Sequence, residues 1–228
     1  MKKTKIALAV IGLVFSQTFL NSCNQDSVDM QTETVASKSS DISVSNLDGQ
    51  NYFDNPDIFN QGVNFIKAKV AQNGPGYVLT QNDLNEFYQI TQIPDADRLP
   101  LDTVNQLIGQ TTAYSQLTFY EALTNLGYSN PAKDLAVAIS NSYMPDLENK
   151  LAINNLPQNE KEFLRNLNKY RLNYEQGAII GGGVMSKDGG GFIGGAIGLG
   201  IGFAVAGPPG AFIGGTIGWF VGVALDNK

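Results

Sequence analysis

Apolar side chains recur three or four residues apart over most of residues 51–176, which is the spacing of one face of an α-helix. Helix-start signals accompany this pattern. Asn55-Pro56 supplies an N-cap followed by a first-position proline, and Thr80-Gln81-Asn82-Asp83 matches a capping box with Asp in place of Glu. We therefore predict an all-α domain of five helices, at about residues 55–73, 80–93, 102–126, 129–145 and 157–175.

A different pattern follows a predicted linker at residues 177–188. No charged side chain occurs between residues 189 and 225, and glycine alternates there with Ile, Phe, Val, Ala and Trp. Flexible linkers instead combine glycine with polar residues, so this segment is not one of them. Glycine recurs at every fourth position in two runs that are offset by twenty residues. The runs predict a helix-packing surface formed by Gly190, Gly194, Gly198, Gly202, Gly210, Gly214, Gly218 and Gly222.

The two glycine runs are expected to form a helical hairpin over residues 189–228. On a helical wheel, each run places most of its glycines on one side and its bulky apolar residues on the other. Gly207-Pro208-Pro209-Gly210 interrupts the helix between the runs. If the glycine faces meet, Gly198→Leu should disrupt their packing, whereas Gly200, on the opposite side of the wheel, should tolerate added bulk.

The glycine content favours a membrane environment for this hairpin. Each interior glycine costs a helix in water about 1 kcal/mol relative to alanine, and the first run holds seven between Gly190 and Gly202. A bilayer makes the helix obligatory because unpaired amides cost more there. Arms of about 18 and 16 residues reach roughly 27 and 24 Å, so spanning the usual 30 Å would require thinning or oligomerisation. The alternative is a hairpin folded onto the helical domain, without bilayer contact.

The N-terminus has the pattern of a secretory signal, with a lysine-rich start and an apolar run at residues 6–15. Leu20-Asn21-Ser22-Cys23 resembles the lipobox of bacterial lipoproteins, although Asn21 departs from the small or β-branched residue usual there. The resemblance implies that residues 1–22 are removed and that Cys23 is acylated, with palmitate as one such lipid. Because Cys23 is the sole cysteine, an intramolecular disulfide and a cysteine metal cluster are excluded.

The sequence that follows the cysteine predicts a lipidated, flexible tether over residues 23–50. It is rich in Ser, Asp, Thr, Gln and Asn and has no aromatic residue, so it lacks the apolar surface needed to offset chain entropy. Without residues 1–22 the chain has 12 basic and 21 acidic residues, a net charge of −9. That sign argues against nucleic acid as a partner, because phosphate binding needs clustered Lys and Arg.

The reactive side chains of the sequence predict no enzyme. The chain contains no histidine, which excludes histidine metal sites and Ser-His-Asp triads. The acidic pairs Asp95/Asp97 and Glu160/Glu162 lie near a proline loop or a helix start, where carboxylates cap amides or favour the helix dipole. We therefore predict no catalytic residue, no metal site and no cofactor.

Together, the cysteine motif and residues 189–225 resemble the glycine-zipper two-transmembrane lipoproteins of bacterial envelopes. The resemblance implies a lipid-anchored location in the cell envelope, which we expect at the outer membrane. The expected function is a structural or interaction role, with Cys23 and the hairpin as two attachments to membrane lipid and the helical domain meeting a protein partner. The alternative is a bacteriocin-like effector whose hairpin inserts into target membranes and self-associates through its glycine faces.

Overall fold

The computed structural model describes residues 52–74, 77–180 and 190–226, with the backbone alone for residues 224–226. The predicted signal peptide, Cys23, the tether and most of the predicted linker therefore lie outside the described residues. The described chain is all helical, as predicted, and contains no strand. Its elements are η1 (Tyr52–Asp54), α1 (Pro56–Asn73), α2 (Gln81–Ile90), η2 (Asp95–Asp97), α3 (Leu101–Tyr114), α4 (Phe119–Asn125), α5 (Asn130–Asn141), α6 (Leu147–Ile153), α7 (Gln158–Glu175) and α8 (Gly190–Asp226).

Local capping chemistry determines where several helices begin. The Asn55 side chain accepts a hydrogen bond from the Asp57 amide at 3.1 Å, so α1 starts where the Asn-Pro signal predicts. Thr80 and Asp83 form the predicted reciprocal capping box at the start of α2. Starts were also predicted correctly for α5, which Ser129 caps, and for α7, which follows Pro157.

The helix predicted over residues 102–126 is wrong in one respect, because the chain forms two helices there. α3 ends with Ser115 as its C-cap, and Thr118 begins α4. The Thr118 amide donates to Glu121 Oε2 at 2.8 Å, and the Glu121 amide donates back to Thr118 Oγ1 at 3.2 Å. In a continuous helix these two amides would donate to backbone carbonyls four residues earlier. Here they donate to side chains of the capping box instead, so a new helix starts at this point.

The short helix α6 is absent from the prediction. It lies between Pro145 and Pro157, where the sequence predicts no helix. Leu147 and Leu151, four residues apart, are its buried side chains. Ala152 and Ile153 are also apolar but exposed, so the apolar positions of this short stretch do not define one helical face, and tertiary packing decides the structure here.

α8 is a helical hairpin whose chain reverses at the predicted place. Ala206 has φ −147° and ψ 24°, and Gly207 has φ 63° and ψ −149°, so neither residue is helical. The positive φ of Gly207 is readily available only to glycine. Pro208 and Pro209 then begin the second arm, where missing amide hydrogens cost little. The two arms, residues 190–205 and 208–226, are called the hairpin below.

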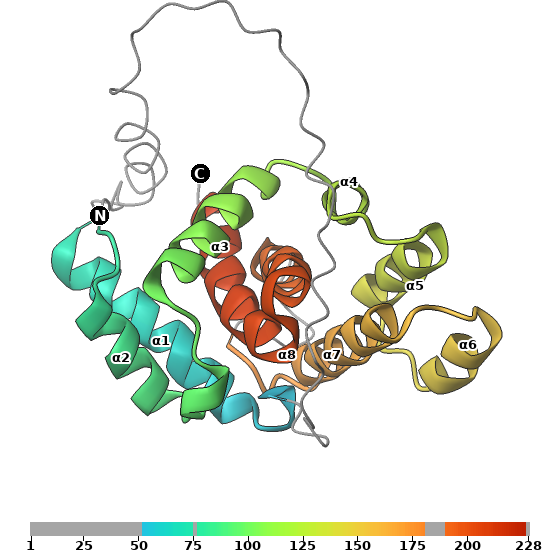
Figure 1. Cartoon of the computed structure of the whole chain (residues 1–228), viewed down its shortest axis with the longest axis horizontal. Coiled ribbons are helices and arrows are strands. Elements are labelled where there is room, and N and C mark those ends of the chain that lie inside the picture. Colours follow the sequence, from blue (N-terminus) through green and yellow to red (C-terminus); the bar gives the residue numbers. More distant parts are fainter. Residues whose placement is uncertain (1–51, 75–76, 181–189, 227–228) are drawn as a thin grey trace, which may run out of the picture.

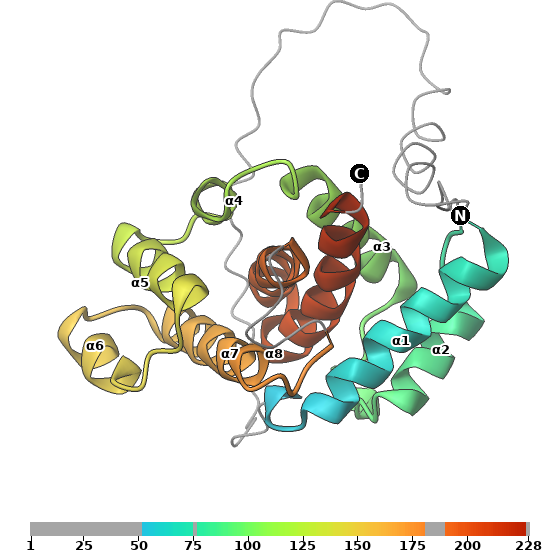
Figure 2. The ribbon, with the colours of Figure 1, turned by 180° about the vertical axis from the view of Figure 1, so that it is seen from behind.

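The hairpin lies at the centre of the molecule, with the other helices arranged around it (Figures 1 and 2). η1, α1, α3, α4 and α7 contact it and are called the sheath below, whereas α6 lies at the periphery (Figure 1). The predicted division into a helical domain at 51–176 and a separate membrane hairpin at 189–228 therefore does not describe this arrangement. The hairpin joins the domain because its uncharged arms and the apolar stripes of the sheath cover each other, so that both remove apolar surface from water.

One aromatic cluster joins the hairpin to the sheath. The Phe212 ring of the second arm lies 6.0 Å from that of Phe53 and 6.1 Å from that of Phe59, measured between centroids. Tyr170 of α7 lies within 5.6 Å of both sheath rings. All four side chains are fully buried. The hairpin and the sheath consequently share one hydrophobic core.

Candidate functional site

The arms of the hairpin meet through glycine. A Cβ added at Gly198 would lie 2.8 Å from the carbonyl carbon of Gly214 and closer still to its oxygen, and one added at Gly194 would meet the backbone of Gly218 and Gly222. Real Cβ atoms do not approach backbone so closely, so only glycine permits this spacing. The structure brings together all of the predicted packing positions in this interface: Gly190, Gly194, Gly198, Gly202, Gly210, Gly214, Gly218 and Gly222.

The partner of each glycine face is the other arm of the same chain. Gly202 faces Gly210, and Gly218 faces Gly194, so the contact runs along the hairpin from its turn toward its open end. The predicted self-association between chains would have to use these same faces. Within the described fold the faces are already occupied, so such association would require the hairpin to open.

Other glycines of the first arm face the sheath. A Cβ at Gly195 would meet the Tyr170 hydroxyl and lie 2.8 Å from its Cζ atom. A Cβ at Gly200 would lie 3.3 Å from Leu123 Cδ2 and 3.6 Å from Phe163 Cε2. The expectation that Gly200 tolerates bulk is therefore wrong for a residue as large as leucine, because the helical wheel does not show that the sheath covers this side of the arm.

Two buried tyrosines, one between α4 and α5 and one in α7, donate hydrogen bonds to the hairpin backbone. Tyr128 donates to the Gly200 carbonyl at 3.2 Å, and Tyr170 donates to the Gly191 carbonyl at 3.5 Å. Burial raises the pKa of both phenols, so they remain neutral donors. These bonds cannot be predicted from the sequence, since nothing local pairs Tyr170 with residue 191.

The hairpin contacts solvent at its turn. Ala204 is exposed, residues 205–208 are half-buried, and the sequence from Ala204 to Pro209 has no polar side chain. We call residues 204–209 the tip. At the open end, Ile193, Phe220, Val221 and Val223 are half-buried, whereas the middle of both arms is buried. Among the described residues, the stretch Gly190–Val223 has the length and composition of a membrane span; its most apolar 18 residues have a mean hydropathy of 1.6, and 67% of them are buried.

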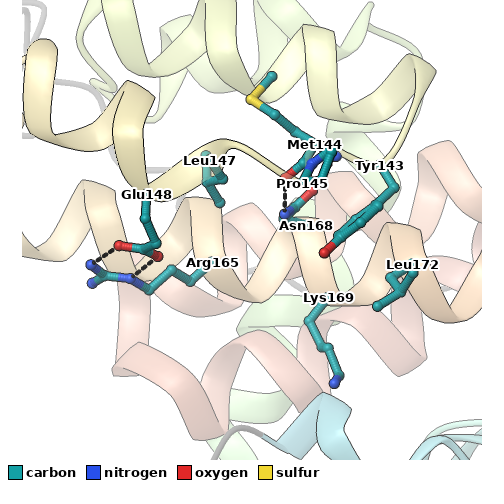
Figure 3. A pocket seen from close by; sticks show the side chains of 9 residues that line it. All are labelled: Tyr143, Met144, Pro145, Leu147, Glu148, Arg165, Asn168, Lys169 and Leu172. Atoms are coloured by element: carbon teal, nitrogen blue, oxygen red, sulfur yellow. Dashed lines mark hydrogen bonds and ion pairs between the residues drawn. The ribbon is translucent and has the colours of Figure 1, made fainter.

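A separate hollow of about 280 Å³ lies where the segment between α5 and α6 crosses α7 (Figure 3). Asn168 holds that segment, because its side chain accepts from the Met144 amide and donates to the Met144 carbonyl, both at 2.9 Å. Arg165 binds Glu148 through two hydrogen bonds of 2.8 Å and thereby holds the pKa of Glu148 below its usual value. Lys169 pairs with Asp54 at 2.9 Å. The charged groups that line the hollow are thus already paired.

The acidic pairs singled out in the sequence have separate structural partners. Asp95 pairs with Arg98 at 2.7 Å, and Asp97 accepts from the Tyr52 hydroxyl. Glu160 accepts from the Ser129 amide at 2.7 Å and from its hydroxyl at 2.6 Å, so it helps to fix the start of α5 instead of that of its own helix. Glu162 accepts from the Gln158 side chain at 3.0 Å. These carboxylates therefore serve capping and pairing roles.

The described residues contain no group of three or more His, Cys, Asp or Glu side chains placed to hold a metal ion. Comparison with protein-family models, with curated proteins and with solved structures found no match. The hairpin, with its glycine interface, its tyrosine contacts and its apolar tip, is therefore the candidate functional feature that the geometry defines.

Proposed function

We propose that this chain is a lipid-anchored protein of the bacterial envelope with a structural or interaction role, attached to the membrane through acylated Cys23. The Leu20–Cys23 motif supports the anchor, and the cover over the hairpin is the structural observation that leaves this anchor as the resting attachment. The glycine faces of the hairpin pack on each other, and its bulky faces pack on the sheath. In this folded state the hairpin stabilises the domain, and the attachment to lipid falls on Cys23.

The dimensions of the hairpin also support this assignment. The arms at residues 190–205 and 208–226 extend roughly 24 and 28 Å at about 1.5 Å per residue, against a hydrocarbon core of about 30 Å. In the resting protein, a second attachment through the hairpin would also uncover the apolar faces of the sheath, which is unfavourable unless those faces reach a membrane surface. The folded domain instead presents charged and polar side chains to solvent, including the paired groups around the hollow near α6. That surface is where we place contacts with a protein partner.

Cys23→Ser tests the anchor. We expect the precursor to remain uncleaved and unlabelled by a palmitate analogue, because the thiol that carries the lipid is gone. The double variant Cys23→Ser with Ser27→Cys is the matched control, since it restores a thiol four residues away from the lipobox. We expect no label in that variant either, and labelling of either variant would contradict the proposed lipidation.

A chain that starts at Asn24 tests the second part of the proposal. It lacks both the signal and the cysteine, so its only route to a membrane is the hairpin. We expect this chain to fractionate with soluble proteins because the sheath covers the hairpin. Tight membrane binding without Cys23 would instead show that the hairpin is a second attachment in the resting protein.

A further inference from the structure

The arms of the hairpin are self-contained in their hydrogen bonding except at their ends. Both are helical, with Ala206 and Gly207 outside helical geometry, so the backbone groups of their interior residues pair within each arm. The hydroxyl of Thr216, the only polar side chain between residues 189 and 218, donates back to the Phe212 carbonyl at 2.8 Å. The glycine interface joins the arms without help from the sheath. A unit of this kind meets the main requirement of a bilayer interior, where every backbone polar group must be satisfied internally.

The sheath holds the hairpin by contacts that lipid can replace. Apolar side chains such as Leu123 and Phe163 cover the first arm. The hydrogen bonds from Tyr128 and Tyr170 go to carbonyls of helical residues, and both are long for bonds from a hydroxyl. Acyl chains would keep the bulky faces of the arms away from water equally well. Sheath helices with one apolar face are suited to lie in the membrane interface afterwards.

The buried indole of Trp219 separately favours a position of the hairpin in a membrane. Trp219 is 6% exposed, and its Nε1 atom is buried and has no hydrogen-bond partner among the residues that the structure describes. A buried donor that lacks an acceptor is unfavourable in the folded domain. The ring lies beside Gly191, at the open end of the hairpin. In a bilayer entered by the tip, this end would lie at the headgroups, where tryptophan is enriched and its N–H finds acceptors.

The tip gives the direction of entry. Surface turns are normally rich in Gly, Pro, Asn, Asp and Ser, and the last three add polar side chains that suit contact with water. The tip has the Gly and Pro of a turn but no polar side chain, and it is the part of the hairpin turn that solvent reaches. An uncharged tip can cross the headgroups without burying a charge, and the arms behind it have no charge as far as residue 225.

We infer that the hairpin can leave the sheath and enter a lipid bilayer tip first as an intact pair of arms. This inference rests on the proposed function only in that the Cys23 anchor would hold the domain near the bilayer. Entry keeps the glycine interface, places the bulky faces against acyl chains and brings Trp219 to the headgroups. It differs from the bacteriocin-like alternative because the glycine faces stay paired within one chain.

Trp219 is the only tryptophan, so its fluorescence reports on the hairpin alone. The mature chain is mixed with phosphatidylcholine vesicles whose acyl chains carry bromine either near the headgroups or near the methyl ends. We expect bromine near the headgroups to quench Trp219 more strongly. Ala204→Asp places a charge on the exposed tip and should lower the quenched fraction about tenfold or more, because charged residues are costly at bilayer depth.

Ala152→Asp on α6 is the matched control, since it makes the same change at an exposed helical alanine far from the hairpin. It should quench like the unmodified chain, and circular dichroism should show that both variants are folded. Absence of quenching in the unmodified chain, or equal quenching in both variants, overturns the inference. Quenching of a chain that takes no palmitate label would contradict only the anchor, and a labelled chain without quenching would contradict only the insertion.

Discussion

Gly198→Ala is expected to lower the melting temperature of the chain that starts at Asn24 by about 6 to 12 °C. The added Cβ would meet the Gly214 carbonyl and lie 3.0 Å from Gly218 Cα. These are backbone atoms, so they cannot rotate out of the way as a flexible side chain could. The arms must separate, which loses contact along the whole interface. We expect a net loss of about 3 kcal/mol, at the upper end for overpacking, with roughly 2 to 4 °C per kcal/mol for a domain of this size.

Gly215→Ala is the control within the same arm. A Cβ at Gly215 meets nothing closer than Phe53 Cζ at 3.5 Å, which is ordinary van der Waals contact. Alanine also favours a helix over glycine by up to about 1 kcal/mol, so this variant should be as stable as the unmodified chain or more stable. Circular dichroism during heating measures both variants. Equal melting temperatures for the two would show that the glycine faces are not in contact.

Phe212→Ala should have the second large effect, a loss of about 3 to 5 kcal/mol, which is typical when a buried phenylalanine is truncated. Phe212 is fully buried against Tyr52, Phe53 and Phe59, so its removal leaves a cavity where the hairpin meets the sheath. Urea denaturation monitored by tyrosine fluorescence measures the change. Because the tyrosines near this cluster belong to the sheath, the signal reports whether the sheath loses stability when a hairpin residue is changed.

Phe220→Ala controls for the loss of an aromatic ring from the same arm. Phe220 is half-buried at the open end, so the cost should be less than half that of Phe212→Ala. If both variants unfold at the same urea concentration as the unmodified chain, the hairpin and the sheath are independent units. That result would restore the separate membrane hairpin that the sequence alone favours.

Local chemistry explains what the sequence could predict. The Asn55 cap, the Thr80–Asp83 capping box and the prolines that start α5 and α7 act within four residues, so they can be seen without the fold. The same holds for the reversal at Gly207-Pro208, where a positive φ and missing amides end one arm and start the next. Fourfold glycine spacing likewise indicates a smooth helix face, whatever covers it.

What could not be predicted depends on contacts between distant residues. Periodicity shows that a helix has an apolar face but not whether lipid or protein covers it, because both are apolar. The sequence therefore could not place the hairpin inside the sheath or pair Tyr128 with Gly200 across 72 positions. The break at Thr118 is a different case. Its Thr-x-x-Glu signal was present, but the apolar pattern that continued through residue 126 concealed it.

The central claim is that the hairpin is the core of the folded domain, and removing it tests this most directly. A chain limited to residues 51–176 retains every sheath helix but exposes the rings that pack on Phe212. We predict that it lacks a cooperative unfolding transition in urea and near-ultraviolet circular dichroism, whereas the chain that starts at Asn24 shows both. A cooperative transition of the truncated chain at the same urea concentration, with native near-ultraviolet dichroism, would contradict the claim.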